Sequence, residues 1–393
     1  MICRFRVRVT EPGTGGEGVT GALEVFDVII VGAGPGGSAA ALSALRARPS
    51  ARVLVLDRAP LGRDKVCGDG VSPDAAEEIA RLGLPELLHP SERVYRFRLV
   101  AGDADTTGTA LIPGYVVPRA ELDHRLMLAA GSAGAIYRQH AVREVQQDSN
   151  RVVVDGKYSA PVLIGADGAN STVRRAVGQP PNRGHHVALA VRGYAPAPAG
   201  FDGLYLRWDP LPGAGLHYAW AFATAHDTVN LGYGTTASVV TRAQLEDRAA
   251  ELLPGFEVRS TRMTGHMLPL STQTPRTAIG RVLLVGDAAS LVNPLTGEGI
   301  FCALASGALA GSAAVAGNAG ESYSRALRRR FGRQHRQLKA LYPLLGRPSV
   351  IPTALRACGR DPRIFRQLIS IGLGAGTFRV IDLARFAASM WRS

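Results

Sequence analysis

A cysteine stands in a glycine-rich stretch of this chain, where a reactive thiol would have room to act. Cys67 is followed closely by Gly68 and Gly70 in KVCGDGVSP, residues 65–73. A thiol can donate a proton to a carbon atom or steer a polarised intermediate, and glycines let a loop pass close to a flat ligand. The alternative is that Cys67 is a small loop residue and that the glycines only shape a turn. The stretch alone leaves both interpretations open.

The segment before this loop has the pattern of a dinucleotide-binding unit. A β-branched run at residues 28–31 leads into GAGPGG, residues 32–37, and a second apolar run at 53–56 ends at Asp57. The glycines allow a tight turn, the approach of a pyrophosphate and close helix packing. The free N–H groups at the start of the following helix favour phosphate, and Asp57 is placed to accept hydrogen bonds from a ribose. This pattern predicts a nucleotide site without separating NAD from FAD.

Three later segments narrow the choice of nucleotide. VPRAELDHRLMLAA predicts a helix that opens with Arg119, and PVLIGADGANSTVRRAV predicts a buried strand before the pair Asp167–Gly168. RVLLVGDAASLVNPLTGEGI, residues 281–300, predicts a strand, the pair Gly286–Asp287 and a glycine-rich turn into a helix of small residues.

The order of these motifs resembles FAD-dependent oxidoreductases of the aromatic-hydroxylase fold. Within that superfamily, CGDGVSP and NPLTGEGI most resemble the geranylgeranyl reductase family, which includes bacterial menaquinone-side-chain reductases. The resemblance covers residues 24–320. It implies FAD as the cofactor and an α/β fold: an FAD-binding, Rossmann-like domain of three layers (ββα), interleaved with an antiparallel-sheet substrate domain and followed by a C-terminal helical region.

The resemblance also implies roles for individual residues. Arg119 is expected at the FAD phosphates, Asp287 at the ribityl or pyrophosphate portion, and residues 294–299 along the isoalloxazine ring. The resemblance assigns no role to Glu298, which is interpreted as a helix-capping carboxylate. Cys67 is the expected catalytic residue, beside the substrate. The expected cofactor-binding residues are Gly32, Gly34, Gly36, Gly37, Asp57, Arg58, Arg119, Val142, Asp167, Gly168, Gly286, Asp287, Pro294, Gly297, Gly299 and Ile300.

An aromatic stripe marks the expected substrate side. In LHYAWAFATAHDTVNLGYG, Tyr218, Trp220 and Phe222 alternate and therefore share one face of a strand. That face is predicted to bind a small hydrophobic substrate by forming a wall for a prenyl chain, and it resembles the YxWxF core of the family's substrate motif. The alternative is ordinary core packing.

The motifs divide the chain into four parts. A chain of 393 residues predicts more than one hydrophobic core, and strand alternation around the aromatic stripe separates the substrate part from the nucleotide part. The expected parts are a flexible extension (1–23), a discontinuous FAD-binding domain (24–90, 117–182 and 272–320), a substrate-binding sheet domain (91–116 and 183–271) and a basic helical region (321–393).

The positive charge is concentrated at the C-terminal end. The formal net charge is +13, and residues 321–393 hold 15 Lys and Arg against three acids. Without an aromatic-interleaved nucleic-acid motif, these cations are interpreted as solvated helix faces that leave peripheral contact with an anionic membrane open, with no nucleic-acid partner. Apolar positions among these arginines are Leu341, Leu344, Leu345, Ile364, Leu368 and Ile371.

The spacing of the cysteines and histidines argues against a disulfide-stabilised protein and against a metalloprotein. The four cysteines are scattered, which favours a reducing, cytoplasmic location over a disulfide scaffold. His185 and His186 are expected to point in opposite directions along a strand, and His217 and His226 lack ligand spacing, so no metal site is expected. Because no second strand–glycine turn–helix unit follows, the reductant is expected to be NAD(P)H that docks briefly or a separate electron donor.

Three functions remain open from the sequence. The leading one is reduction of carbon–carbon double bonds in an isoprenoid-type substrate by reduced FAD. The alternative is an FAD-dependent monooxygenase or epoxidase, which the same fold supports. A third is a lipid-binding peripheral membrane protein that retains the flavoprotein fold. The oligomeric state is not predicted.

Overall fold

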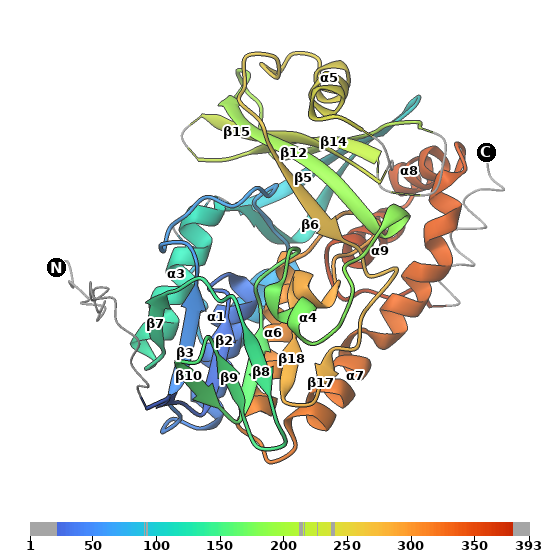
Figure 1. Ribbon diagram of the computed structural model, residues 1–393. Coiled ribbons are helices and arrows are strands. Elements are labelled where there is room, and N and C mark those ends of the chain that lie inside the picture. The colour runs from blue at the N-terminus through green and yellow to red at the C-terminus, as the bar shows by residue number, and fades with distance from the viewer. Residues whose placement is uncertain are drawn as a thin grey trace.

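The computed structural model describes residues 22–89, 91, 93–211, 215, 217–225, 227–236 and 240–379. Most of the expected N-terminal extension, the last residues of the basic region and His226 lie outside the described residues. Figure 1 shows a lower part built around parallel strands and an upper part built on a large sheet, with the C-terminal helices running along one side of both.

A six-stranded sheet forms the centre of the lower part. Its order is β17 (Ala278–Ile279), β18 (Val282–Leu284), β11 (Val162–Gly165), β2 (Val28–Val31), β3 (Val53–Asp57) and β7 (Ile136–Gln139), all parallel except β17. The three middle strands β11, β2 and β3 consist almost entirely of buried Val, Leu and Ile, because layers cover the sheet on both faces. A four-stranded sheet lies on one side of this parallel sheet. Its order is β1 (Glu24–Val25), β10 (Tyr158–Ala160), β9 (Val152–Val154) and β8 (Val145–Gln147).

Helices α1 (Pro35–Ala47), α3 (Arg119–Ser132) and α6 (Ile300–Ala314) make the third layer. Helices α1 and α6 touch through small residues. A Cβ atom at Gly307 would lie 2.1 Å from the carbonyl oxygen of Gly36, and one at Gly311 would lie 2.0 Å from that of Ala40. The Ala- and Gly-rich sequences therefore allow the two helices that begin at the glycine turns to pack side by side.

The upper part contains an eight-stranded sheet. Its order is β16 (Thr264–Pro269), β12 (Val187–Pro196), β15 (Thr228–Thr235), β14 (His217–Ala223), β13 (Leu204–Trp208), β5 (Arg93–Ala101), β6 (Ala104–Val116) and β4 (Gly70–Val71). The sheet is antiparallel apart from the β13–β5 pair, which is parallel. The predicted antiparallel sheet is thus present with one parallel pair, which arises because the chain crosses through the lower part between β6 and β12 before it returns.

Helices cover both faces of the large sheet. On one face, α5 (Arg242–Leu252) packs on residues of β12, β14 and β15; on the other, α8 (Val350–Arg360) and α9 (Pro362–Leu373) pack on β5 and β6. The remaining helices are α2 (Pro73–Arg81), α4 (Thr172–Ala176) and α7 (Ala319–Leu341), with 3-10 turns at Gly184–His186, Gly286–Ala289 and Tyr342–Gly346. The α/β fold class with a C-terminal helical region is confirmed.

The C-terminal helices pack against the rest of the molecule. Helix α7 buries Tyr323, Leu327 and Phe331. Ile364 and Ile371, which the sequence offered as apolar positions for a membrane, are buried instead. Within the described residues, no helix is both long enough and apolar enough to cross a membrane.

Candidate active site

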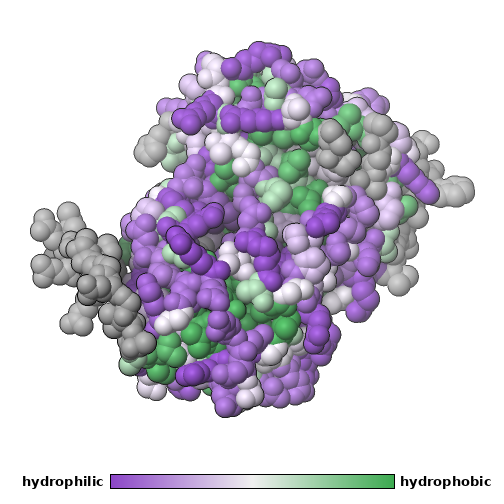
Figure 2. Space-filling view, viewed as in Figure 1, coloured by the Kyte–Doolittle hydropathy of each residue, from purple (hydrophilic) through white to green (hydrophobic). Residues whose placement is uncertain are grey.

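A cavity of about 660 Å³ lies between the parallel sheet and the large sheet. On the face in Figure 2, hydrophilic side chains dominate, and hydrophobic ones gather between the upper and lower parts and again within the lower part. The cavity wall brings together eighteen of the expected site residues: Gly32, Gly34, Gly36, Asp57, Arg58, Cys67, Arg119, Val142, Asp167, Gly168, Tyr218, Trp220, Phe222, Gly286, Asp287, Gly297, Gly299 and Ile300.

Two expected residues lie outside the cavity wall. Gly37 packs against the turn itself, since a Cβ atom there would lie 1.8 Å from the carbonyl oxygen of Gly32. Pro294 is buried behind the loop, and the wall is formed by residues 296–300 instead. Pro294 therefore does not line the cavity and its contact with the cofactor stays a prediction, whereas the packing expected of Gly37 is what the geometry shows.

The glycine turn leaves the start of α1 open to the cavity. Gly32 has φ +107°, and a Cβ atom there would lie 2.2 Å from the carbonyl oxygen of Ala166, so only glycine fits. No side chain caps the N-terminus of α1, and no acidic residue lies in its first turn. Free N–H groups and the positive end of the helix dipole therefore face the cavity. This arrangement fits a pyrophosphate.

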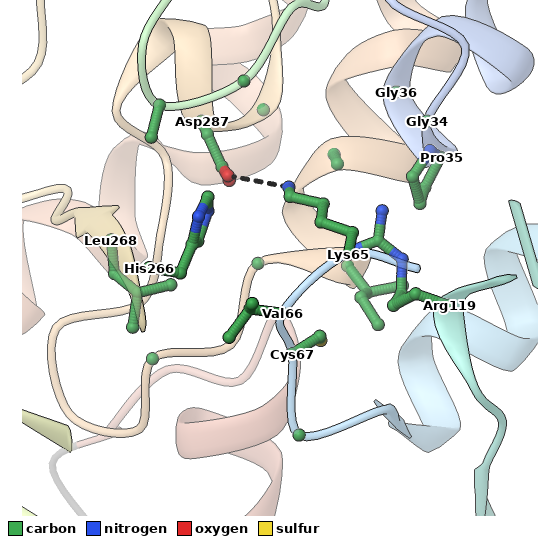
Figure 3. Close-up of a pocket in the computed structure, with 18 of the residues that line it drawn as sticks. Gly34, Pro35, Gly36, Lys65, Val66, Cys67, Arg119, His266, Leu268 and Asp287 are labelled. Atoms are coloured by element: carbon green, nitrogen blue, oxygen red, sulfur yellow. Dashed lines mark hydrogen bonds and ion pairs between the residues drawn. The ribbon is translucent and has the colours of Figure 1, made fainter. Parts of the chain in front are cut away.

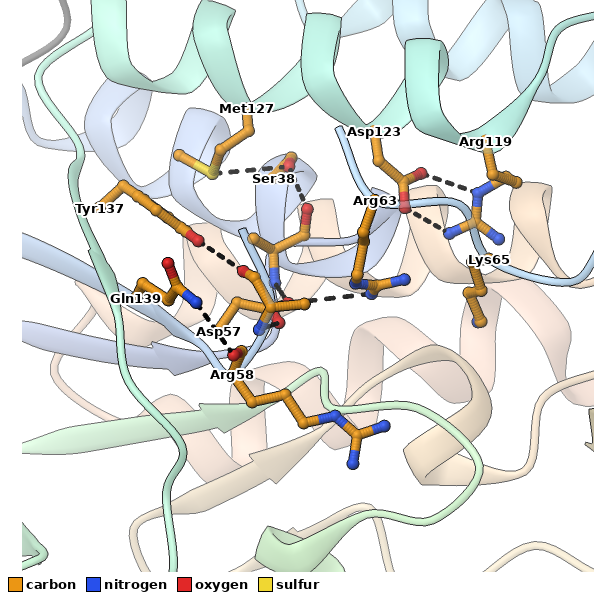
Figure 4. Close-up of polar contacts among 12 residues, drawn as sticks. Ser38, Asp57, Arg58, Arg63, Lys65, Arg119, Asp123, Met127, Tyr137 and Gln139 are labelled. Atoms are coloured by element: carbon orange, nitrogen blue, oxygen red, sulfur yellow. Dashed lines mark hydrogen bonds and ion pairs between the residues drawn. The ribbon is translucent and has the colours of Figure 1, made fainter. Parts of the chain in front are cut away.

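The acid at the end of β3 is bound to the same turn. Asp57 Oδ2 accepts a hydrogen bond from the backbone N–H of Ala33 (2.7 Å), and Oδ1 accepts one from Ala59 (2.9 Å). Arg63 lies 3.9 Å from Oδ2. Figure 4 shows these contacts next to Arg58, whose guanidinium extends away from them. Asp57 thus holds the glycine turn in place and lines the cavity beside it.

Arg119, at the first position of α3, forms a buried ion pair with Asp123. Two hydrogen bonds of 2.7 Å join the guanidinium to the carboxylate (Figure 4). The pKa of Arg119 is raised: burial alone would lower it, but Asp123 and the Cys67 thiol nearby outweigh that effect. A Cβ atom at Gly34 would lie 3.6 Å from the guanidinium. The cation therefore stands beside the glycine turn, where a phosphate would be bound.

The Cys67 loop is held by two residues of the large sheet. Asn230, on β15, donates from Nδ2 to the carbonyl oxygen of Cys67 and to Asp69 Oδ2, both at 2.8 Å, and accepts from Trp220 Nε1 (2.9 Å). Arg192, on β12, donates to the carbonyl oxygens of Cys67 (3.1 Å) and Lys65 (2.9 Å). Cys67 is half-buried. Burial raises the pKa of its thiol, which therefore stays protonated at neutral pH.

Asp69 lies behind this loop rather than in the cavity. Its carboxyl group is fully buried, and its backbone has φ +61°. Tyr194 and Asn230 donate to Oδ2, and Oδ1 has no hydrogen-bond partner. Burial raises the pKa of Asp69 to about 6. Its contacts make it part of the support of the Cys67 loop.

Lys65, His266 and Asp287 form a polar group on the cavity wall (Figure 3). Lys65 Nζ lies 3.3 Å from Asp287 Oδ2. Burial alone would raise the pKa of Asp287, but Lys65 and His266 hold it below its usual value. Burial, with Lys65 adding to it, lowers the pKa of His266 to about 4, so the imidazole is neutral. Its Nε2 is buried without a hydrogen-bond partner.

The loop before α6 brings another carboxyl group to the cavity. Glu298 Oε1 accepts a hydrogen bond from the backbone N–H of Phe301 (2.6 Å), so the expected capping role is what the geometry shows. Burial raises the pKa of Glu298 to about 7. The Tyr218 hydroxyl donates to the carbonyl oxygen of Thr296, and the Thr296 hydroxyl donates to that of Gly372. The loop is thus fixed both by the aromatic strand and by the end of α9.

The Asp167 carboxylate accepts hydrogen bonds mainly from residues that follow it closely in the sequence. It accepts from the Ser171 hydroxyl (2.5 Å) and from the backbone N–H groups of Thr172 (2.6 Å) and Val173 (3.1 Å). Burial raises its pKa. Asp167 lines the cavity, but its hydrogen bonds first serve the start of α4.

Aromatic side chains form the wall opposite the glycine turn. The rings of Tyr218 and Trp220 are 6.0 Å apart, and those of Trp220 and Phe222 are 6.4 Å apart. All three line the cavity, as do Leu206 and, from the end of α9, Leu373. The lining residues that come from the large sheet are uncharged at neutral pH; His266 gains a charge only at low pH. This wall therefore fits an apolar ligand.

Several residues of the site gave no signal in the sequence. His266, Arg192 and Asn230 stand alone in strands without a motif, and only the sheet register brings them to the loop or the cavity. The expected directions of His185 and His186 were wrong: they lie in a 3-10 turn, and their rings are 3.9 Å apart. Among the described residues, no group of His, Cys, Asp or Glu has the arrangement of a metal site.

Comparisons with known proteins agree with this geometry. Residues 27–371 match the family model described as lycopene cyclase protein. A menaquinone reductase of Mycolicibacterium smegmatis is 34% identical over 403 residues, covering 93% of this chain and 95% of that protein. A digeranylgeranylglycerophospholipid reductase of Methanopyrus kandleri is 32% identical over 317 residues, covering 74% and 80%.

Solved structures share the fold. A geranylgeranyl bacteriochlorophyll reductase-like protein of Thermoplasma acidophilum has a TM-score of 0.76 at 20% identity, covering 95% of this chain and 98% of that one. A flavin-dependent brominase has a TM-score of 0.72 at 17% identity, covering 94% and 98%. Fold, cavity and relatives define an FAD-dependent oxidoreductase. The chain belongs to the lycopene cyclase protein family, and its relatives are the menaquinone and geranylgeranyl reductases that the motifs predicted.

Proposed function

We propose that this enzyme reduces carbon–carbon double bonds of a hydrophobic, isoprenoid-type substrate. The observation that carries the proposal is that one cavity is lined by a glycine turn with a free helix start, by an uncharged aromatic wall and by Cys67. Relatives named as menaquinone and digeranylgeranylglycerophospholipid reductases support the substrate class.

The residues of the lower part would hold FAD. The open start of α1 and Arg119 suit the pyrophosphate, and Asp57 suits a ribose. Lys65 and Asp287, with the loop at 296–300, suit the remainder of the cofactor. FAD, once reduced, supplies a hydride. We assign FAD binding to segments 24–90, 117–182 and 272–320, and substrate binding to segments 91–116 and 183–271.

The residues of the upper part would bind and orient the substrate. Tyr218, Trp220 and Phe222 exclude water and pack on a prenyl chain. Asn230 and Arg192 fix the backbone of Cys67, so that its thiol is presented to the same space. Because burial keeps this thiol protonated, it can donate a proton or steer a polarised intermediate.

The source of electrons and the cellular setting complete the proposal. The reductant is NAD(P)H that docks transiently or a separate donor, in the cytoplasm.

Peripheral contact with an anionic membrane is supported by exposed cations along α7, namely Arg325, Arg328, Arg329, Arg333, Arg336 and Lys339. Salt-sensitive binding to anionic liposomes that disappears when these are changed to glutamine would support this contact; unchanged binding would refute it.

Anaerobic turnover tests the main proposal. The purified protein, loaded with FAD and reduced by dithionite, is mixed with prenylated quinones or prenyl diphosphates. We expect reoxidation of the flavin and a product with two additional hydrogens. In a parallel aerobic assay with NADPH as reductant, substrate-dependent oxygen uptake with an oxygenated product would instead establish the monooxygenase alternative. Failure of the folded protein to bind FAD would refute both.

A further inference from the structure

Glu298 differs from the other carboxyl groups that line the cavity. Asp57, Asp64 and Asp287 each lie within ion-pair distance of a cation, namely Arg63, Arg192 and Lys65. Asp167 uses both oxygens to accept hydrogen bonds at the start of α4. Among the described residues, no Lys, Arg or His forms an ion pair with Glu298. It is therefore the cavity acid whose surroundings least favour a permanent negative charge.

The position of Glu298 suits the release of a proton. It lies just before α6, and Phe301 N–H donates to Oε1 at 2.6 Å, which fixes the orientation of the carboxyl group. The start of a helix stabilises a carboxylate once it forms. Burial, together with Asp74, opposes that charge more strongly than the backbone N–H groups of Phe301 and Ile300 and the Arg119 cation favour it, so the pKa of Glu298 is raised to about 7. Both protonation states are thus accessible near neutral pH, as a general acid requires.

Glu298, Cys67 and Tyr218 line the same cavity. The Tyr218 hydroxyl interacts electrostatically with both Glu298 and Cys67, and its hydrogen bond to Thr296 joins the aromatic strand to the Glu298 loop. At neutral pH the thiol of Cys67, whose pKa is raised by burial, is the weaker acid of the two. Asp69 does not line the cavity and cannot reach a substrate directly.

We propose that Glu298 is the general acid of this site. The inference rests on the proposed alkene reduction. When bound and reduced, FAD would supply the hydride, and with it the two electrons, for one carbon of the π bond. Glu298 would donate its carboxyl proton to the other carbon as the π bond breaks, and would remain a carboxylate until it takes up a proton from water. Cys67 then orients the reacting carbons rather than supplying the proton.

Single-turnover kinetics of the FAD-loaded protein test this assignment. Glu298→Gln keeps an oxygen that can accept from Phe301 N–H but has no acidic proton. We expect the alkene-dependent reoxidation of the reduced flavin to slow by about 10²–10⁴-fold, with FAD affinity unchanged. The wild-type rate should fall as pH rises through about 7, because the acid form of Glu298 is lost; the variant should lack this pH dependence, and Glu298→Asp should restore part of the rate.

Asp74→Asn supplies a second, milder test. Asp74 does not line the cavity, and its negative charge is one cause of the raised pKa of Glu298. Removal of that charge should move the pH-dependent fall in rate to lower pH without changing the rate at acid pH. A pH dependence that stays in place would contradict the assignment.

An infrared titration gives a readout independent of turnover. The wild-type protein should lose a protonated-carboxyl band as pH rises through about 7, and Glu298→Gln should lack that band. If the wild-type protein reduces prenyl alkenes and Glu298→Gln does so at the same rate and with the same pH dependence, only the acid assignment fails. If the wild-type protein reduces no prenyl alkene, the proposed function fails and the acid assignment fails with it.

Discussion

Replacement of Asn230 by leucine should loosen the Cys67 loop. Asn230 is fully buried and makes three hydrogen bonds, to the carbonyl oxygen of Cys67, to Asp69 and from Trp220. Leucine has a similar volume and can make none of them. With about 0.5–1.5 kcal/mol for each hydrogen bond, and with the Trp220 N–H left unpaired, we expect the free energy of unfolding to fall by about 2–4 kcal/mol.

Urea unfolding and thiol labelling measure this effect. In a Cys3→Ser background, the other cysteines, Cys302 and Cys358, are buried, so labelling of the native protein reports on Cys67. The Asn230 variant should unfold at lower urea concentration, and Cys67 should react faster. Asn150→Ala is the control, because Asn150 is exposed and should change stability by less than about 0.5 kcal/mol. A loss of stability below about 1 kcal/mol with an unchanged labelling rate would refute the view that Asn230 holds the loop.

Three further predictions concern packing, charge and pH. Gly307→Ala places a Cβ atom 2.1 Å from a backbone oxygen of α1 and should lower the free energy of unfolding in urea by about 1–3 kcal/mol, whereas Gly317→Ala, with no atom within 4 Å, should not. Arg119→Met leaves Asp123 buried without its cation, so stability should fall by about 3–5 kcal/mol and the affinity for FAD, followed by flavin fluorescence, should drop at least tenfold; unchanged FAD affinity would exclude a role at the phosphates. Asp69 binds its proton more tightly in the folded state, where its pKa is about 6 against 3.8, so stability should fall by about 2 kcal/mol as pH rises from 4 to 6; Asp69→Asn should remove this slope in urea unfolding, and a slope that persists would contradict it.

Local patterns predicted the parts of the site that lie within one segment. The turn at residues 32–37 requires glycine because carbonyl oxygens of the turn itself and of Ala166 occupy the space of a side chain. Alternation in β14 predicted that Tyr218, Trp220 and Phe222 share a face, and all three line the cavity. Such features could be predicted because they depend on the geometry of a strand or of a strand–turn–helix unit, which a short sequence specifies.

Local reasoning was wrong where the backbone departed from the assumed element. His185 and His186 were placed on a strand, in which neighbouring side chains point apart, but a 3-10 turn brings their rings within 3.9 Å. The parallel pairing of β13 with β5 depends on the route of the chain between them and has no local pattern.

The sequence by itself determined the class of this protein: three nucleotide-binding segments in a recognisable order, an α/β fold and an aromatic strand. Only the tertiary structure decided how the chemistry is supported. Asn230 meets Cys67 across 163 positions of sequence, Lys65 meets Asp287 across 222, and Glu298 faces the cavity that Cys67 and Tyr218 also line. Hydrogen bonds and burial act over a few ångströms, so the contacts that orient a thiol or raise the pKa of a carboxyl group exist only once the two sheets enclose the cavity.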